Sequence, residues 1–144
     1  MFSTSFASSI VDIFGGNVYI APITSCYIGL STTTPDTDGS NFTEPSSAYA
    51  YARVLLGQRS SSASTYNPHY MVASGSAGVG TLQNDRIIYF NEATGSWGTI
   101  THFGLFTSAS ATTPFIYGAL QSSVTILANY VPMFRAGNLV ITLS

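Results

Sequence analysis

The sequence contains very little charge. Of its 144 residues, only 10 are charged, namely four arginines and six acidic residues, and there is no lysine. This is 7% of the chain, whereas an ordinary soluble domain carries about a quarter. The formal net charge of −2 provides no basic surface for nucleic acid, so no nucleic-acid partner is expected. Because soluble monomers normally keep charge on their surface, we expect much of this surface to be covered by other protein chains.

Long apolar runs and cysteine pairs are also missing. No apolar stretch approaches the length that spans a bilayer, so no membrane partner is expected. No basic segment is followed by an apolar one, so no secretory signal is predicted. The single cysteine, Cys26, excludes an internal disulfide. Hydrophobic residues make up 45% of the chain, which excludes a disordered tail and predicts one domain over residues 1–144 with a real core.

One helix is predicted, over residues 2–16. Phe6, Ile10, Ile13 and Phe14 recur at helical spacing and would form one apolar stripe. Gly15 and Gly16 supply the stop.

The rest of the chain predicts short strands. These runs are rich in β-branched and aromatic residues and are separated by clusters of Gly, Ser, Thr, Asn and Pro. The predicted strands are 26–31, 49–56, 86–90, 100–106, 115–120, 124–127 and 138–143. We therefore expect a mainly β fold, a single antiparallel β-sandwich of jelly-roll type with one short N-terminal helix.

Residues 57–80 predict a long insertion between strands. The stretch is rich in Ser, Gly and Ala, and it contains two tyrosines, a histidine and a methionine. Large aromatic side chains and methionine are uncommon in flexible linkers but are enriched at protein interfaces. Tyr66, His69, Tyr70 and Met71 are therefore candidate interaction residues. A mobile loop is the alternative.

Other aromatic residues allow two interpretations. Tyr49 and Tyr51 alternate with alanines and would share one strand face, either in the core or at a subunit contact. They are therefore also candidate interaction residues. Trp97 follows a turn and precedes a strand, where a large ring commonly plugs the end of a sandwich. A sugar-binding platform built from Trp97 and the tyrosines is the less favoured alternative.

No catalytic or metal-binding pattern emerges. Residues 36–44 contain several oxygen ligands, but Asn41 and Glu44 stand sixth and ninth where an EF-hand needs Gly sixth and Glu twelfth, so a polar loop with an Asx-type turn is favoured. The histidine in strand 100–106, His102, is favoured as a packing residue over a catalytic base. We predict no enzyme, no metal site and no cofactor.

Several segments resemble one family of small virion structural proteins of tailed bacteriophages, often labelled tail fibre protein or head decoration protein. The resemblance extends from about Phe6 to Leu143. The segments that carry it are CYIGLSTTTP (26–35), TEP (43–45), YARV (51–54), IIYF (87–90), ATGSWGTITHFGLF (93–106), GAL (118–120) and FRAGNLVITL (134–143). The chain departs from the family in the length of 57–80 and at Thr107-Ser108-Ala109, where an Asp often stands, so function cannot be carried onto those loops.

The resemblance implies a non-enzymatic component of the virion, assembled in the cytoplasm of a bacterial host. A compact knob of this length favours a capsid decoration or cement protein; the alternative is a tail fibre or tail-tip component, or a carbohydrate-binding module for host adsorption. The expected partners are the major capsid protein or other virion proteins. Low charge also motivates self-association, with a trimer as the guess. A host glycan is a less favoured partner.

Overall fold

The computed structural model describes residues 1–15, 24–58, 70–76 and 79–143. Within these residues the order of elements begins with the helix α1 (Thr4–Phe14), the strand β1 (Ser25–Ser31), the short 3₁₀ helix η1 (Ser47–Tyr49) and β2 (Val54–Gln58). It continues with β3 (Met71–Ser76), β4 (Val79–Asn84), β5 (Ile88–Tyr89), β6 (Gly98–Phe106), β7 (Ile116–Ile126), β8 (Met133–Phe134) and β9 (Val140–Leu143). The predicted mainly β fold with one short N-terminal helix is confirmed.

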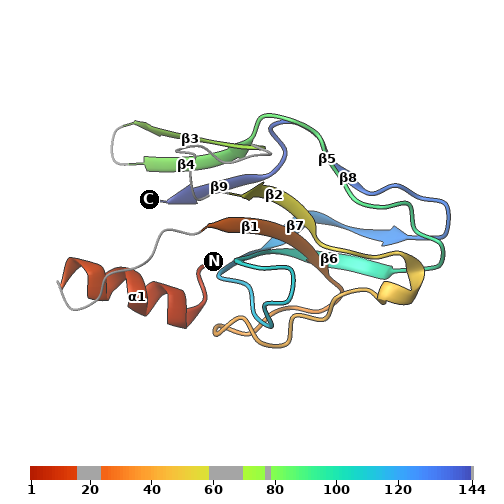
Figure 1. The fold of residues 1–144 in the computed structure, drawn as a ribbon, viewed down its shortest axis with the longest axis horizontal. Helices are drawn as coiled ribbons and strands as arrows, with labels where there is room; N and C mark the ends of the chain where they lie inside the picture. The colour runs from red at the N-terminus through yellow and green to blue at the C-terminus, as the bar shows by residue number, and fades with distance from the viewer. Residues whose placement is uncertain (16–23, 59–69, 77–78, 144) are drawn as a thin grey trace.

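The strands form antiparallel sheets that lie one over the other (Figure 1). One sheet has the order β2-β1-β6-β7, a second has the order β3-β4-β9, and β5 pairs with β8. The core lies between these layers, where Leu30 and Ile100 of the four-stranded sheet share a cluster with Ile88 and Leu139 of the other segments. This arrangement agrees with a sandwich, and the jelly-roll topology remains a prediction.

The N-terminal residues fasten the helix to the start of β7. Phe2 forms an antiparallel bridge with Ile116, and the backbone N–H of Ser3 donates to the Phe115 carbonyl at 3.1 Å. The Phe6 ring contacts the Phe2 and Phe115 rings at centroid distances of 5.4 and 5.2 Å. The helix therefore rests on aromatic contacts, while Val11 on its outer side is 67% exposed.

The structure corrects the predicted bounds of the strand 49–56 and of the strands 115–120 and 124–127. Residues 49–53 do not belong to β2, because η1 ends at Tyr49 and Ala50 takes a left-handed conformation, with φ of 64°. That turn breaks the expected alternation, so Tyr49 is 46% exposed whereas Tyr51 is 7% exposed. The runs 115–120 and 124–127 are joined in the single strand β7.

The predicted insertion at 57–80 is in part a hairpin. Met71 pairs with Asn84 and Ser76 with Val79, so residues 71–76 form β3 where a loop was expected. The strand is short of large side chains, and its pairing depends on backbone hydrogen bonds, which the pattern of hydrophobic residues does not reveal. Residues 59–69 and 77–78 lie outside the described residues.

Candidate interaction site

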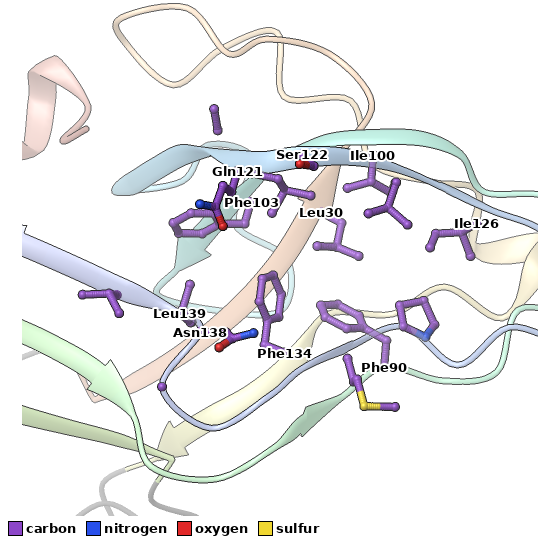
Figure 2. Close-up of a pocket in the computed structure, with 17 residues that line it drawn as sticks. Leu30, Phe90, Ile100, Phe103, Gln121, Ser122, Ile126, Phe134, Asn138 and Leu139 are labelled. Carbon is purple, nitrogen blue, oxygen red and sulfur yellow. The ribbon is translucent and has the colours of Figure 1, made fainter.

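An apolar groove separates the four-stranded sheet from the segment that contains β8 and β9 (Figure 2). Its volume is about 660 Å³. Strands β1, β6 and β7 supply one wall, and residues 132–140 supply most of the other. The lining residues are Leu30, Phe90, Ile100, Phe103, Ala119, Leu120, Gln121, Ser122, Val124, Ile126, Pro132, Met133, Phe134, Gly137, Asn138, Leu139 and Val140. None of these carries a charge.

The groove has a buried floor and an exposed rim. Leu30 and Leu139 of the floor are 4% and 1% exposed and belong to the core cluster. Phe134 lies across the groove from Phe103, and their ring centroids are 6.4 Å apart in an edge-to-face arrangement (Figure 2). The three large rim side chains Val124, Met133 and Val140 are 48%, 47% and 47% exposed. The rim therefore offers apolar side chains that burial would stabilise.

Strand β7 borders the groove as an edge strand. The sheet order places β7 last, and residues 1–3 cover only its beginning through the bridge from Phe2 to Ile116. Between the pairs Ile100–Val124 and His102–Ala119, β6 advances by two residues and β7 by five. Residues 120–123 therefore leave the regular ladder, and Gln121 and Ser122 line the groove. Among the described residues the outer edge of 118–126 has no neighbouring strand, which makes it a place for another chain to pair.

Asn84 fixes the other wall of the groove. Its side chain is fully buried, and its amide nitrogen donates to the carbonyls of Arg86 at 2.8 Å and Arg135 at 2.9 Å. Its side-chain oxygen accepts from the Leu139 N–H at 2.9 Å. One buried side chain thus joins β4 to the turn at 135–139, which enters β9.

Replacing this side chain is expected to destabilise the protein. Asn84→Ala leaves three backbone groups without their partner, at about 1 kcal/mol or more each, so the free energy of unfolding should fall by about 3 kcal/mol. Urea denaturation measures this loss. Gln121→Ala is the control, since Gln121 is exposed and its replacement should change stability by less than about 0.5 kcal/mol. A loss below about 1 kcal/mol for Asn84→Ala would show that Asn84 does not secure this wall.

A second polar cluster joins Glu44, Tyr51 and Arg53. The Arg53 guanidinium donates to both carboxylate oxygens of Glu44, at 2.9 and 2.7 Å, and the Tyr51 hydroxyl donates to Oε1 at 2.6 Å. Arg53 also lies over the Phe106 ring, with Cζ 3.4 Å from the ring centroid. Its side chain is 9% exposed, so this charge depends on Glu44 for compensation.

The Tyr51 hydroxyl also accepts from the Leu30 N–H at 2.9 Å. This bond satisfies a β1 backbone group beyond the last pairing of β1 with β2, at Ile28 and Val54. Burial raises the pKa of the Tyr51 phenol well above its usual range, with the Glu44 carboxylate as the second cause, so the phenol keeps its proton. A Cβ at Gly29 would lie 2.7 Å from Glu44 Oε1, so the cluster also requires a glycine there.

The residues predicted to form an interaction site lie only in part within the described residues. Tyr66 and His69 lie outside the described residues. Tyr70 and Met71 are partly buried and pack against the core cluster. Tyr51 is buried in the polar cluster and cannot serve as an open contact, because its ring faces the core and its hydroxyl is bonded. Of the described candidates, Tyr49 is the most accessible.

Trp97, predicted to plug the end of the sandwich, is 3% exposed. Its indole N–H donates to the Tyr49 carbonyl at 2.8 Å, and its ring meets the Tyr51 ring edge to face at 5.2 Å. The alternative of a sugar platform that uses Trp97 is therefore wrong, because no face of this ring is open.

The residues weighed for other chemistry have structural contacts. Asp38 accepts from the Ser40 backbone N–H at 2.8 Å, which forms the expected Asx-type turn, and the Ser40 hydroxyl and N–H lower the pKa of its carboxyl. Glu44 turns away from that loop toward Arg53. The His102 Nδ1 lies 2.8 Å from the Thr101 hydroxyl, and burial lowers the histidine pKa. Across the described ranges, no three His, Cys, Asp or Glu side chains come together as metal ligands.

Sequence reasoning missed both the groove and the polar cluster. Phe134 and Met133 lie in a strand of two residues, too short to give a periodic signal. Glu44 and Arg53 belong to two separate segments that carry the family resemblance, and only the fold reveals that their side chains meet. The scarcity of charge was the one available signal for such a groove, since all of its lining is uncharged.

Comparison with known proteins identifies a family. The family described as podophage GP4 fiber I protein gp80 matches residues 1–142 of the chain. A comparison with curated proteins gives no match. In the part of the chain that the structure describes, no helix is long and apolar enough to cross a membrane.

Proposed function

The chain belongs to the podophage GP4 fiber I protein gp80 family, and we propose from this that it is a building block of a phage tail fibre. A member of this family is a structural component of the virion, as the resemblance in the sequence implied. The match covers residues 1–142, so it concerns the whole sandwich. A structural role of this kind needs no catalytic residue, and we assign none.

The family description favours a fibre over capsid decoration. Decoration was the first expectation from the sequence, with a tail fibre or tail-tip component as the alternative. The argument for decoration was the compact length of the chain, whereas the family is described by the word fiber. A short domain can still be one unit of a longer fibre when several copies or several proteins assemble, so length does not oppose the alternative.

We propose that a second copy of the chain covers the apolar groove in the assembled fibre. In an interface between identical chains, a charged side chain can face the same charge on the second copy and be repelled by it. The residues that line the groove carry no charge, so no such repulsion arises there. Covering the rim would add about 25 cal/mol for each Å² of apolar surface buried. The open edge of β7 would allow backbone pairing beside this contact. We also propose, as the sequence analysis expected, that the chain forms a trimer and that it contacts other virion proteins.

The number of copies in the virion tests the fibre assignment. Quantitative mass spectrometry of purified virions, normalised to the major capsid protein, should give on the order of a few dozen copies or fewer, because tail symmetry is low. A count of hundreds of copies would instead support decoration of the capsid and would contradict the proposal.

A further inference from the structure

Strands β5 and β8 form a two-stranded ribbon at the outside of the sandwich (Figure 1). Tyr89 lies directly opposite Met133 in the register, and the two side chains are 54% and 47% exposed. Ile88 and Phe134 form the adjacent pair, and their side chains pack in or against the core cluster. Because successive side chains of a strand point to opposite faces, Tyr89 and Met133 share the outer face of the ribbon.

Two more apolar side chains extend this outer face. Ile87 and Val131 each stand two residues from one of the paired side chains, and they are 38% and 42% exposed. The Phe90 N–H donates to the Pro132 carbonyl at 2.9 Å, so the antiparallel pairing continues toward Val131. Apolar side chains that are grouped on one exposed face commonly mark an interaction surface. The surface called the ribbon face below consists of Ile87, Tyr89, Val131 and Met133.

Opposite charges lie at the two ends of the ribbon face. Arg86 and Arg135 are exposed at one end, where their carbonyls accept from the same Asn84 side-chain nitrogen at 2.8 and 2.9 Å. Asp85 is exposed beside them, so two arginines and one aspartate give this end a net charge of +1. Glu92 is exposed at the other end. Within the described residues, none of these charged side chains forms an ion pair with its own chain.

The spacing of these charges fits a second copy of the same face. Arg86 precedes Tyr89 by three residues, and Glu92 follows it by three. When two ribbon faces pack with their strands antiparallel, the two-fold axis passes at the level of Tyr89, and Arg86 of each copy lies over Glu92 of the other. A parallel arrangement would instead bring the two arginine ends together, where they would repel each other.

We propose that two copies of the chain associate through their ribbon faces in an antiparallel, two-fold arrangement. Tyr89 and Met133 form the centre of this contact, and Arg86 pairs with Glu92 of the second copy at both ends. Tyr89 and Glu92 do not line the apolar groove, so this contact is separate from coverage of the groove, although Met133 borders both surfaces. It is also separate from the proposed trimer, since two-fold and three-fold axes can combine in one closed assembly. The contact is a property of the isolated chain and does not rest on the proposed function.

Site-specific crosslinking tests the contact. Tyr89→Cys places a thiol at the level of the two-fold axis. Packed sheets lie about 10 Å apart, too far for a disulfide, so the purified variant would be treated with a bismaleimide that spans about 10 Å. We expect a covalent dimer as the main product on a denaturing gel.

Val11→Cys is the matched control for the crosslink. Val11 is 67% exposed on α1, so its replacement offers an equally reactive thiol away from the ribbon face. At the same protein concentration it should yield severalfold less covalent dimer. The native Cys26 is present in both variants, and burial raises its pKa to about 12, so its thiol reacts slowly.

Charge reversal in the Tyr89→Cys variant tests the orientation. Glu92→Arg alone, or Arg86→Glu together with Arg135→Glu, places like charges at both ends of the contact and should lower the yield of crosslinked dimer about tenfold. When the two charge-reversed proteins are mixed, opposite charges meet again at both ends of a mixed pair, so the yield should recover. All of these positions are exposed, and the melting temperature should change little.

Equal yields of dimer from Tyr89→Cys and Val11→Cys would overturn this inference. A charge-reversed protein that crosslinks as well as its parent, or a mixture that does not recover, would overturn the antiparallel arrangement. Neither result would alter the copy number in the virion, which tests the fibre assignment separately. A copy number of hundreds would overturn the fibre assignment but leave the crosslinks intact.

Discussion

Glu44→Ala should lower the free energy of unfolding by about 3 kcal/mol or more, the largest loss of stability that we expect from one substitution. Arg53 donates two hydrogen bonds to this carboxylate and is only 9% exposed, so the variant leaves a guanidinium largely buried without its counter-charge. The Tyr51 hydroxyl loses its acceptor in the same variant. Thermal unfolding followed by circular dichroism should show a midpoint lower by about 10 °C.

Two further variants separate charge compensation from mere loss of contacts. Asp12→Ala removes an exposed carboxylate from α1 and should change stability by less than about 0.5 kcal/mol. The double variant Glu44→Leu with Arg53→Met removes both charges and should be more stable than Glu44→Ala alone, because no unpaired charge remains. If Glu44→Ala cost less than about 1 kcal/mol, or if the double variant were the less stable of the two, the cluster would not work as described.

The double variant Val124→Asp with Met133→Asp should abolish self-association and reduce incorporation into virions by about 100-fold. Both side chains are about half exposed at the rim, at 48% and 47%, so the isolated domain should keep its fold. In an assembled interface each aspartate would be an unpaired buried charge, and each would cost several kcal/mol. Sedimentation of the purified protein and immunoblotting of purified virions measure the two effects.

Val11→Asp is the matched control for the groove. Val11 is 67% exposed on α1, and it takes no part in the groove lining. The same change of chemistry at this position should leave both association and incorporation at the wild-type level. Normal incorporation of the rim variant would contradict the proposal that the groove is covered in the virion. A wild-type protein that stays monomeric at micromolar concentrations would contradict coverage by a second copy.

The spacing of hydrophobic residues predicted the elements whose formation depends on residues that are close together in the sequence. The spacing of Phe6 and Ile10 located α1. Leu139 and Val140, neighbours in the predicted strand 138–143, are 1% and 47% exposed, as the alternation of side chains in a strand requires. The helix was placed at 2–16 and occupies Thr4–Phe14, since caps and last turns are poorly marked in sequence.

Long-range pairing accounts for what could not be predicted. The alternation of Tyr49 and Tyr51 with alanines predicted a strand. Instead, Ala50 takes a left-handed conformation, so that Tyr49 is exposed and Tyr51 is buried. No neighbouring residue in the sequence indicates that turn. Asn84 bonds across 51 and 55 positions to Arg135 and Leu139, a relation that only the assembled sheets create. The site therefore depends on tertiary contacts, while its lack of charge was visible in the composition from the start.

We propose that this chain is a tail-fibre component whose apolar groove is covered in the virion. Immunogold electron microscopy with an antibody against the exposed helix α1 tests the location on intact particles. If the chain is a tail-fibre component, gold should label the tail and not the head. Gold distributed over the capsid would contradict it.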